Sequence, residues 1–218
     1  MKGYKMFNPD WTCREMQYGG PGTTARVEGP IKLCECGMHF CTNISDCFRY
    51  YRPAPWNHLC EVEAVGEIDG PADADSKYCT NELKIIRELP LAEMLRDRDF
   101  CMKIVSIDGW HLAYVENQTE DVCLAAVRQN GWALQYVKEQ TPDICLAAVQ
   151  RKGWALAYVK KQAPDICLAA VQRNGGALEY VKDQTPDICV AAVRKSEKSS
   201  AENAADIAPL SIEFSYIY

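Results

Sequence analysis

The sequence has no long apolar run and no excess of positive charge. No stretch approaches the roughly 20 apolar residues that a membrane-spanning helix needs, and the opening segment MKGYKMFNPD lacks the apolar core of a secretory signal. The net charge of −6 at pH 7 argues against a nonspecific nucleic-acid binder held by phosphate contacts. We therefore expect a cytoplasmic protein that binds neither nucleic acid nor membrane.

The chain has 218 residues, of which 48% are hydrophobic and 25% charged, typical of a globular protein with room for two modest cores. We expect an α+β fold with three parts: an α+β domain over residues 1–92, helical-hairpin repeats over 93–195, and a polar linker with an apolar tail over 196–218. Without a secretory signal, the 12 cysteines are expected to be thiols.

The second half is a tandem repeat with a period of 22 residues. Its units start at Asp99, Asp121, Asp143, Asp165 and Asp187. The middle units, such as DICLAAVQRKGWALAYVKKQAP, are regular, the opening unit is looser, and the last is half a unit, as expected for the ends of a repeat array. One hairpin cannot bury its own apolar faces, so we expect neighbouring units to stack into an α-solenoid.

Each unit is predicted to contain two short α-helices. In the unit that starts near residue 143, Thr141 suits the N-cap of the first helix, Pro142 its first turn, and Gly153 the left-handed residue that ends it. The second helix then begins at Trp154. One cysteine position recurs in every unit, and because stacked hairpins are spaced too widely for disulfides, we expect core thiols at Cys101, Cys123, Cys145, Cys167 and Cys189.

Two aromatic rows run along the repeats. They are Trp110, Trp132 and Trp154, and Tyr114, Tyr136, Tyr158 and Tyr180. They either pack between units or form a partly exposed ladder that binds a partner protein, and the candidate partner-binding residues are Trp110, Trp132, Trp154, Tyr114, Tyr136 and Tyr158. Gly176 interrupts the tryptophan row. Either Phe214, Tyr216 or Tyr218 folds back to cap the array there, or the tail pairs as a strand with the N-terminal sheet.

These units resemble a family of short helical repeats of unknown function that begin P-D-x-C-L-A-A-V and occur in bacterial, phage and giant-virus proteins. The resemblance covers nearly half the chain. It implies the helical-repeat fold and little about activity.

The N-terminal part alternates strand-like and turn-like segments. Strands are predicted at KGYKMFNP, as a pair within ARVEGPIKLCECG, at HLCEVEAVGEI and at ELKIIREL; a helix is predicted at ISDCFRYYRP and a loop at DGPADADSKYC. This part resembles an N-terminal domain of unknown function from phage and bacterial proteins, with the patterns Y-K-x-F-N-P-D-W-T-C and G-x-H-F-C.

The stretch GMHFCTNISDCFRYY followed by EVEAVGEI also resembles the poly(ADP-ribose) polymerase class of ADP-ribosyltransferases. That resemblance implies a split-sheet fold that binds NAD, with Tyr50 stacking on nicotinamide, Lys5 as a second cofactor contact, and His39 in the catalytic set. CTNELKI places Glu82 as the catalytic glutamate, which would orient the ribose hydroxyls. Two positions depart from the family: Tyr4-Lys5-Met6 stands where it has His-Gly or Arg-Gly, and His39 replaces a tyrosine.

Cysteine and histidine residues cluster between positions 34 and 60. They are Cys34, Cys36, His39, Cys41, Cys47, His58 and Cys60. Thiolates and imidazoles are the ligands of structural zinc, but the spacing C-x-C-x4-C-x5-C does not form two C-x2-C pairs. We expect no metal; instead Cys34 and Cys36 lie on one side of a strand and pack.

Within the repeats the sequence contains no His–carboxylate pair and no glycine-rich phosphate loop. We therefore expect a binding protein without a cofactor, whose repeats dock on a partner protein. The resemblances imply a phage or mobile-element origin, which would suit a protein that sequesters or inhibits a host factor. The alternatives are an ADP-ribosyltransferase-like enzyme that uses NAD, and an N-terminal domain that binds a small nucleotide without turnover.

Overall fold

The computed structural model describes residues 1–33, 35–70 and 76–207, with side chains described up to residue 198. The chain divides into two compact units, Met1–Val122 and Cys123–Tyr218. Within the described residues, no helix is both long and apolar enough to span a bilayer.

The first unit is built on an antiparallel seven-stranded sheet in the order β4-β9-β6-β1-β5-β8-β7. Its strands are β1 (Lys2–Phe7), β4 (Thr24–Arg26), β5 (Met38–Cys41), β6 (His58–Ala64), β7 (Ile68–Asp69), β8 (Lys77–Thr80) and β9 (Glu82–Leu89). A separate hairpin joins β2 (Thr12–Cys13) to β3 (Met16–Gln17). Phe7, Phe40, Val62, Leu83 and Ile85 form the centre of the core.

Three predictions for this unit were wrong in part. The helix expected over 44–53 is only α1 (Ile44–Cys47), because Phe48 turns inward and is buried. The segment 25–37 forms only β4 and an isolated bridge from Lys32 to Cys36. The expected loop at 69–79 contains most of β8. The strands expected near 2–9, 58–68 and 82–89 are present.

The first repeat belongs to this same compact unit. Helix α2 (Leu91–Met94) leads into α3 (Arg98–Ile107) and the 3-10 helix η1 (Gly109–Tyr114). Phe48 packs edge-on against Phe100 of α3 at 5.4 Å, and Trp56 against Tyr114 of η1 at 6.3 Å. The N-terminal domain of residues 1–92, called the head below, therefore covers one face of the opening repeat. This contact explains why that repeat departs from the regular sequence.

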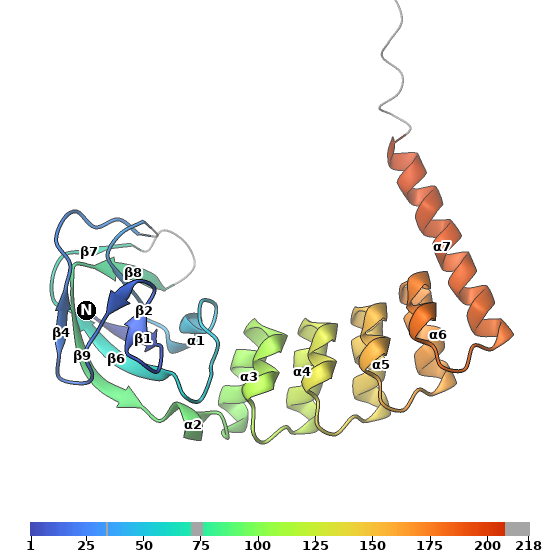
Figure 1. Ribbon diagram of the computed structural model, residues 1–218, viewed down its shortest axis with the longest axis horizontal. Helices are drawn as coiled ribbons and strands as arrows, with labels where there is room; N and C mark the ends of the chain where they lie inside the picture. Colours follow the sequence, from blue (N-terminus) through green and yellow to red (C-terminus); the bar gives the residue numbers. More distant parts are fainter. Residues whose placement is uncertain (34, 71–75, 208–218) are drawn as a thin grey trace, which may run out of the picture. The chain divides into compact units, whose positions relative to one another are not determined.

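The later repeats are regular. Their elements are α4 (Glu120–Gln129), η2 (Gly131–Tyr136), α5 (Pro142–Arg151), η3 (Gly153–Tyr158), α6 (Pro164–Arg173), η4 (Gly175–Tyr180) and α7 (Pro186–Ile207). Helices α5, α6 and α7 pack in succession within the second unit (Figure 1). The Thr141 hydroxyl accepts from the Ile144 amide and Pro142 opens α5, as predicted. The recurrent cysteines are free thiols, buried in the first four repeats and half-buried at Cys189.

The second helix of each unit is a six-residue 3-10 helix rather than the expected α-helix. Because a 3-10 helix has three residues per turn, Gly131, Leu134 and Val137 share one side, and all three are buried. Residues 196–206, expected as a linker, continue α7. The two hypotheses for Phe214, Tyr216 and Tyr218 concern residues outside the described part of the chain.

The repeat glycine serves close packing and not a left-handed turn. Gly153 has no positive φ. A Cβ added there would lie 2.6 Å from the carbonyl oxygen of Ala170 in the next helix, and one at Gly131 would lie 2.6 Å from that of Ala148. The prediction of a left-handed cap was wrong: α5 is followed by Lys152 in an extended conformation, and Gly153 begins η3 where the backbones of successive units leave no room for a side chain.

Candidate functional site

A hollow of about 770 Å³ opens in the head between β1, β5 and the β2–β3 hairpin. Lys5, Arg14, His39 and Tyr51 line it, and the same four residues also line a narrower cleft that continues from it. Tyr50 and Lys77 lie in that cleft. Most of the unusual features of the head meet at this hollow.

Lys5 lies near the middle of β1 and is only 2% exposed. Its Nζ donates to the His39 carbonyl oxygen at 2.7 Å and lies 5.2 Å from the centre of the Tyr18 ring. Burial lowers the pKa of Lys5, because a low-polarity environment disfavours the charged ammonium. Among the groups that act on this pKa, the attractive ones are the thiols of Cys13 and Cys47, not a carboxylate.

Arg14 occupies the turn between β2 and β3 in a left-handed conformation, with φ of 55°. Such a backbone is costly for a residue with a Cβ and is a common feature of functional sites. Arg14 lines both the hollow and the cleft. In the part of the chain that the structure describes, no hydrogen bond or ion pair engages it.

The pKa of His39 reflects the electrostatic potential of the hollow. Its pKa is lowered to about 4, first by burial and then by the positive charges of Lys77, Arg14 and Lys5. The imidazole is therefore neutral near pH 7, and its surroundings are electropositive. Lys77 is also placed 4.3 Å above the ring of Tyr50, a cation–π geometry.

Cysteine thiols also line the hollow and its cleft. Cys41 and Cys47 both face the cleft. The interaction between these two thiols lowers the pKa of Cys41 and raises that of Cys47, and the Cys47 thiol donates to the Tyr4 carbonyl oxygen at 3.4 Å. The Cys13 Sγ lies 3.1 Å from the hydroxyl of Tyr51.

The structure brings together three of the four residues that the ADP-ribosyltransferase likeness suggested. Lys5, His39 and Tyr50 line the cleft, whereas Glu82 lines neither it nor the hollow. Glu82 begins β9 and accepts a hydrogen bond from Arg26 of β4 at 2.8 Å. The arrangement therefore offers cations and aromatic rings to a ligand, without this carboxylate.

Sequence reasoning missed Arg14, Tyr51 and Lys77. Arg14 had a local signal, because TCREMQ places a two-residue turn between short alternating segments. Tyr51 lay in a segment predicted as a longer helix, and Lys77 in one predicted as a loop. Neither segment gave a reason to direct these side chains toward one site.

The cysteine cluster does not pack as expected. Residues 33 and 35–37 belong to no named strand, and Cys36 is exposed, with its thiol directed to the Pro30 carbonyl oxygen at 3.0 Å. The expectation that Cys36 packs was wrong, and Cys34 lies outside the described residues. Among the side chains that the structure does describe, no group of three or more His, Cys, Asp or Glu residues is placed to hold a metal ion.

The aromatic rows of the repeats pack between units and remain partly exposed. Trp132 meets Tyr158 of the next unit edge-on at 5.9 Å, and Trp154 meets Tyr180 in the same way at 5.8 Å. Tyr158 and Tyr180 are each 38% exposed. The other candidate partner-binding residues, which are Trp110, Trp132, Trp154, Tyr114 and Tyr136, are half-buried.

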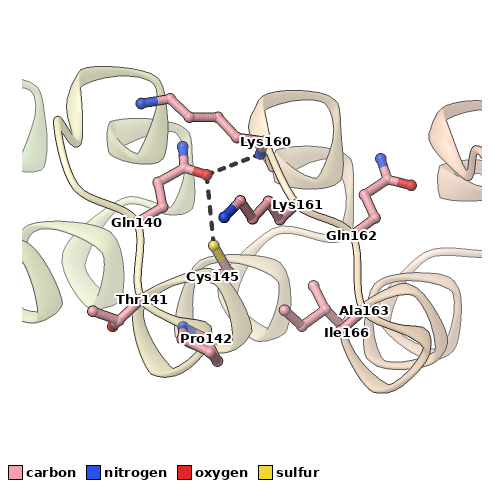
Figure 2. Close-up of a pocket in the computed structure, with 9 residues that line it drawn as sticks. All are labelled: Gln140, Thr141, Pro142, Cys145, Lys160, Lys161, Gln162, Ala163 and Ile166. Atoms are coloured by element: carbon pink, nitrogen blue, oxygen red, sulfur yellow. Dashed lines mark hydrogen bonds between the residues drawn. The ribbon is translucent and has the colours of Figure 1, made fainter.

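A recurrent glutamine connects successive units, as Figure 2 shows beside a pocket of about 560 Å³. The Gln140 side chain donates to the Tyr158 carbonyl oxygen at 2.9 Å and accepts from the Lys160 amide at 2.9 Å. Gln162 makes the equivalent bonds to Tyr180 and Lys182. Sequence reasoning overlooked this residue, although a glutamine stands at the same position in each of four units.

Two family models match the chain. Residues 1–97 match a domain of unknown function (DUF7666). Residues 97–141 and 119–162 match a second domain of unknown function (DUF4116), in overlapping copies that cover the first part of the helical repeats. No curated protein and no solved structure matches the chain. These comparisons support a two-part architecture and give no support to the ADP-ribosyltransferase likeness.

Proposed function

We propose that the protein is a binding protein whose repeats form an α-solenoid scaffold that docks on a partner protein. The observation that carries the proposal is the row of paired Trp and Tyr side chains, repeated every 22 residues and left partly exposed. Aromatic residues held rigidly at a surface are the side chains that contribute most to protein interfaces. Sequestration or inhibition of that partner would need no catalytic groups in the repeats.

The contacts between repeats support this role because they make the surface rigid. The glutamine bridge at Gln140 and the close approach at Gly153 recur one unit later at Gln162 and Gly175. Each joint therefore has the same geometry, and the exposed tyrosines keep a constant spacing. A preorganised surface loses little conformational entropy when it binds.

The test is capture of a partner by the full-length protein from lysate of the cells that make it. The variant Tyr158→Ala/Tyr180→Ala removes the two most exposed members of the row. A control, Glu139→Ala/Arg173→Ala, truncates two exposed side chains of opposite charge elsewhere in the repeats. We expect the wild type and the control to retain the same protein and the tyrosine variant to lose it, with all three proteins folded by circular dichroism.

Equal retention by all three proteins would show that the aromatic row is not the docking surface. Failure of the wild type to retain any protein above a blank matrix would count against the scaffold proposal as a whole.

The second candidate is an NAD-dependent, ADP-ribosyltransferase-like activity of the head. It is favoured by the meeting of Lys5, His39 and Tyr50 around one cleft and disfavoured by the pairing of Glu82 with Arg26 outside it. Incubation with labelled NAD and lysate tests it. Label transfer that disappears in Glu82→Ala would establish the enzyme, and absence of NAD binding by calorimetry would eliminate it.

A further inference from the structure

We propose that the hollow of the head binds a small phosphomonoester that carries an aromatic group, held by Arg14, Lys77 and Lys5. The inference is independent of the docking role of the repeats, since every residue it uses belongs to the head.

The charges of the hollow are the first argument. Three cationic side chains line the hollow and its cleft, and one of them, Lys5, is buried. Among the described residues, the acidic ones in the lining are Glu15 and Glu35, both exposed, and Glu35 is already in an ion pair with Lys32. Burial of a cation is costly unless an anion accompanies it. A dianionic group such as a phosphomonoester matches this excess of positive charge.

The second argument is the conformation of Arg14. The turn holds an arginine where glycine would be unstrained, and in the described residues its guanidinium has no partner. The planar guanidinium presents several donors in the fork geometry that suits phosphate. The strain therefore has a functional explanation, which is to hold a phosphate-binding group at the mouth of the hollow.

The walls and the size define the rest of the ligand. Tyr18, Tyr51, Met16 and Val27 give the hollow an aromatic and apolar side. Its volume of about 770 Å³ lies in the range of small-molecule sites, which are roughly 300–1,000 Å³. Inorganic phosphate alone would leave these rings uncovered, whereas an aromatic group would pack against them.

The test is calorimetric titration of the full chain at pH 7.5 with phenyl phosphate, inorganic phosphate and phenol. Phenyl phosphate is a dianion at this pH, and phenol is its uncharged counterpart. We expect phenyl phosphate to bind more tightly than either of the others. Arg14→Gln and Lys77→Gln should each weaken it about 5- to 10-fold, the loss expected for one charge-assisted contact. Lys84→Gln, which removes the same charge from an exposed position on β9, should leave affinity unchanged.

Three results would overturn the proposal. One is no heat of binding with phenyl phosphate. Another is binding that Lys84→Gln weakens as much as Arg14→Gln does, which would indicate a nonspecific charge effect. The third is equal affinity for phenol, which would show that the cations contribute nothing. Unchanged circular dichroism of each variant separates loss of a contact from loss of the fold.

Discussion

The head and the repeats differ in how their distinctive residues are distributed. In the repeats, a glycine, a glutamine and a Trp–Tyr pair recur at a fixed spacing, and the contacts of Gln140 and of the Trp132–Tyr158 pair are repeated one unit later. In the head, a buried lysine, a left-handed arginine and a neutral histidine occur once each and meet at one hollow. Regular interactions define a shape, whereas costly and unrepeated ones mark a candidate functional site.

The largest expected effect is the acid sensitivity that His39 gives the head. The pKa of His39 is about 4 in the folded state against an ordinary value of 6.5, so the unfolded chain takes up a proton first as the pH falls. The contribution of neutral His39 to the free energy of unfolding is complete above pH 6.5. It is lost progressively toward pH 4, by up to about 3 kcal/mol. Urea denaturation between pH 7 and pH 4 measures this loss.

His39→Gln should flatten that dependence. His111, in the first repeat, also has a pKa lowered by burial, so His111→Gln shows how much of the slope comes from the repeat fold. If His39→Gln keeps the slope of the wild type, the hollow is not the acid-sensitive element.

The second effect compares a glycine that is needed for close packing with one that is needed for its backbone conformation. Gly153→Ala should destabilise the repeats by about 2 kcal/mol, the cost of overpacking, because its Cβ would meet the Ala170 carbonyl oxygen. In the head, Gly29 has a φ of +98° and open space around the added Cβ, so Gly29→Ala should lose only about 1 kcal/mol of backbone energy. Thermal unfolding followed by circular dichroism compares the two; a smaller loss at Gly153 would contradict the close-packing explanation.

The third effect tests the glutamine bridge. Gln140→Glu keeps the shape but replaces the donor to the Tyr158 carbonyl oxygen with a carboxylate oxygen, and should cost about 1–2 kcal/mol at neutral pH. Gln150→Glu makes the same chemical change at an exposed position and should be nearly neutral. Equal denaturation midpoints for the two variants would show that the bridge does not hold the units together.

The smallest effect has the opposite sign. Arg14→Gly should relieve the left-handed strain and stabilise the head by less than about 1 kcal/mol, while it weakens the binding of phenyl phosphate as much as Arg14→Gln does. Arg14→Ala keeps the strain and loses the guanidinium, so it should weaken binding equally without gaining stability. Melting temperatures and titrations on both variants check this; a less stable Arg14→Gly would mean that the arginine serves the fold.

The repeats were more predictable from sequence than the head. The period, the Thr141 cap and the buried cysteines followed from helical spacing and capping chemistry. The 3-10 helices and the glutamine bridge did not, because the contacts that cause them come from the neighbouring unit. In the head, β1, β6 and β9 followed from their apolar content, but the short α1 depends on where Phe48 packs. Lys5, His39 and Tyr50 were identified through a distant likeness, and no local pattern linked them to Arg14 or Lys77.

The glutamine bridge has a consequence for how such a chain can change length. Gln140 reaches Tyr158 and Lys160 as Gln162 reaches Tyr180 and Lys182, so the two junctions are interchangeable. Excision of residues 142–163 would place Thr141 before Pro164 and restore an equivalent junction across the cut. Whole units can therefore be lost or duplicated in a single genetic event without a new interface, and the reach of the array can evolve separately from its head.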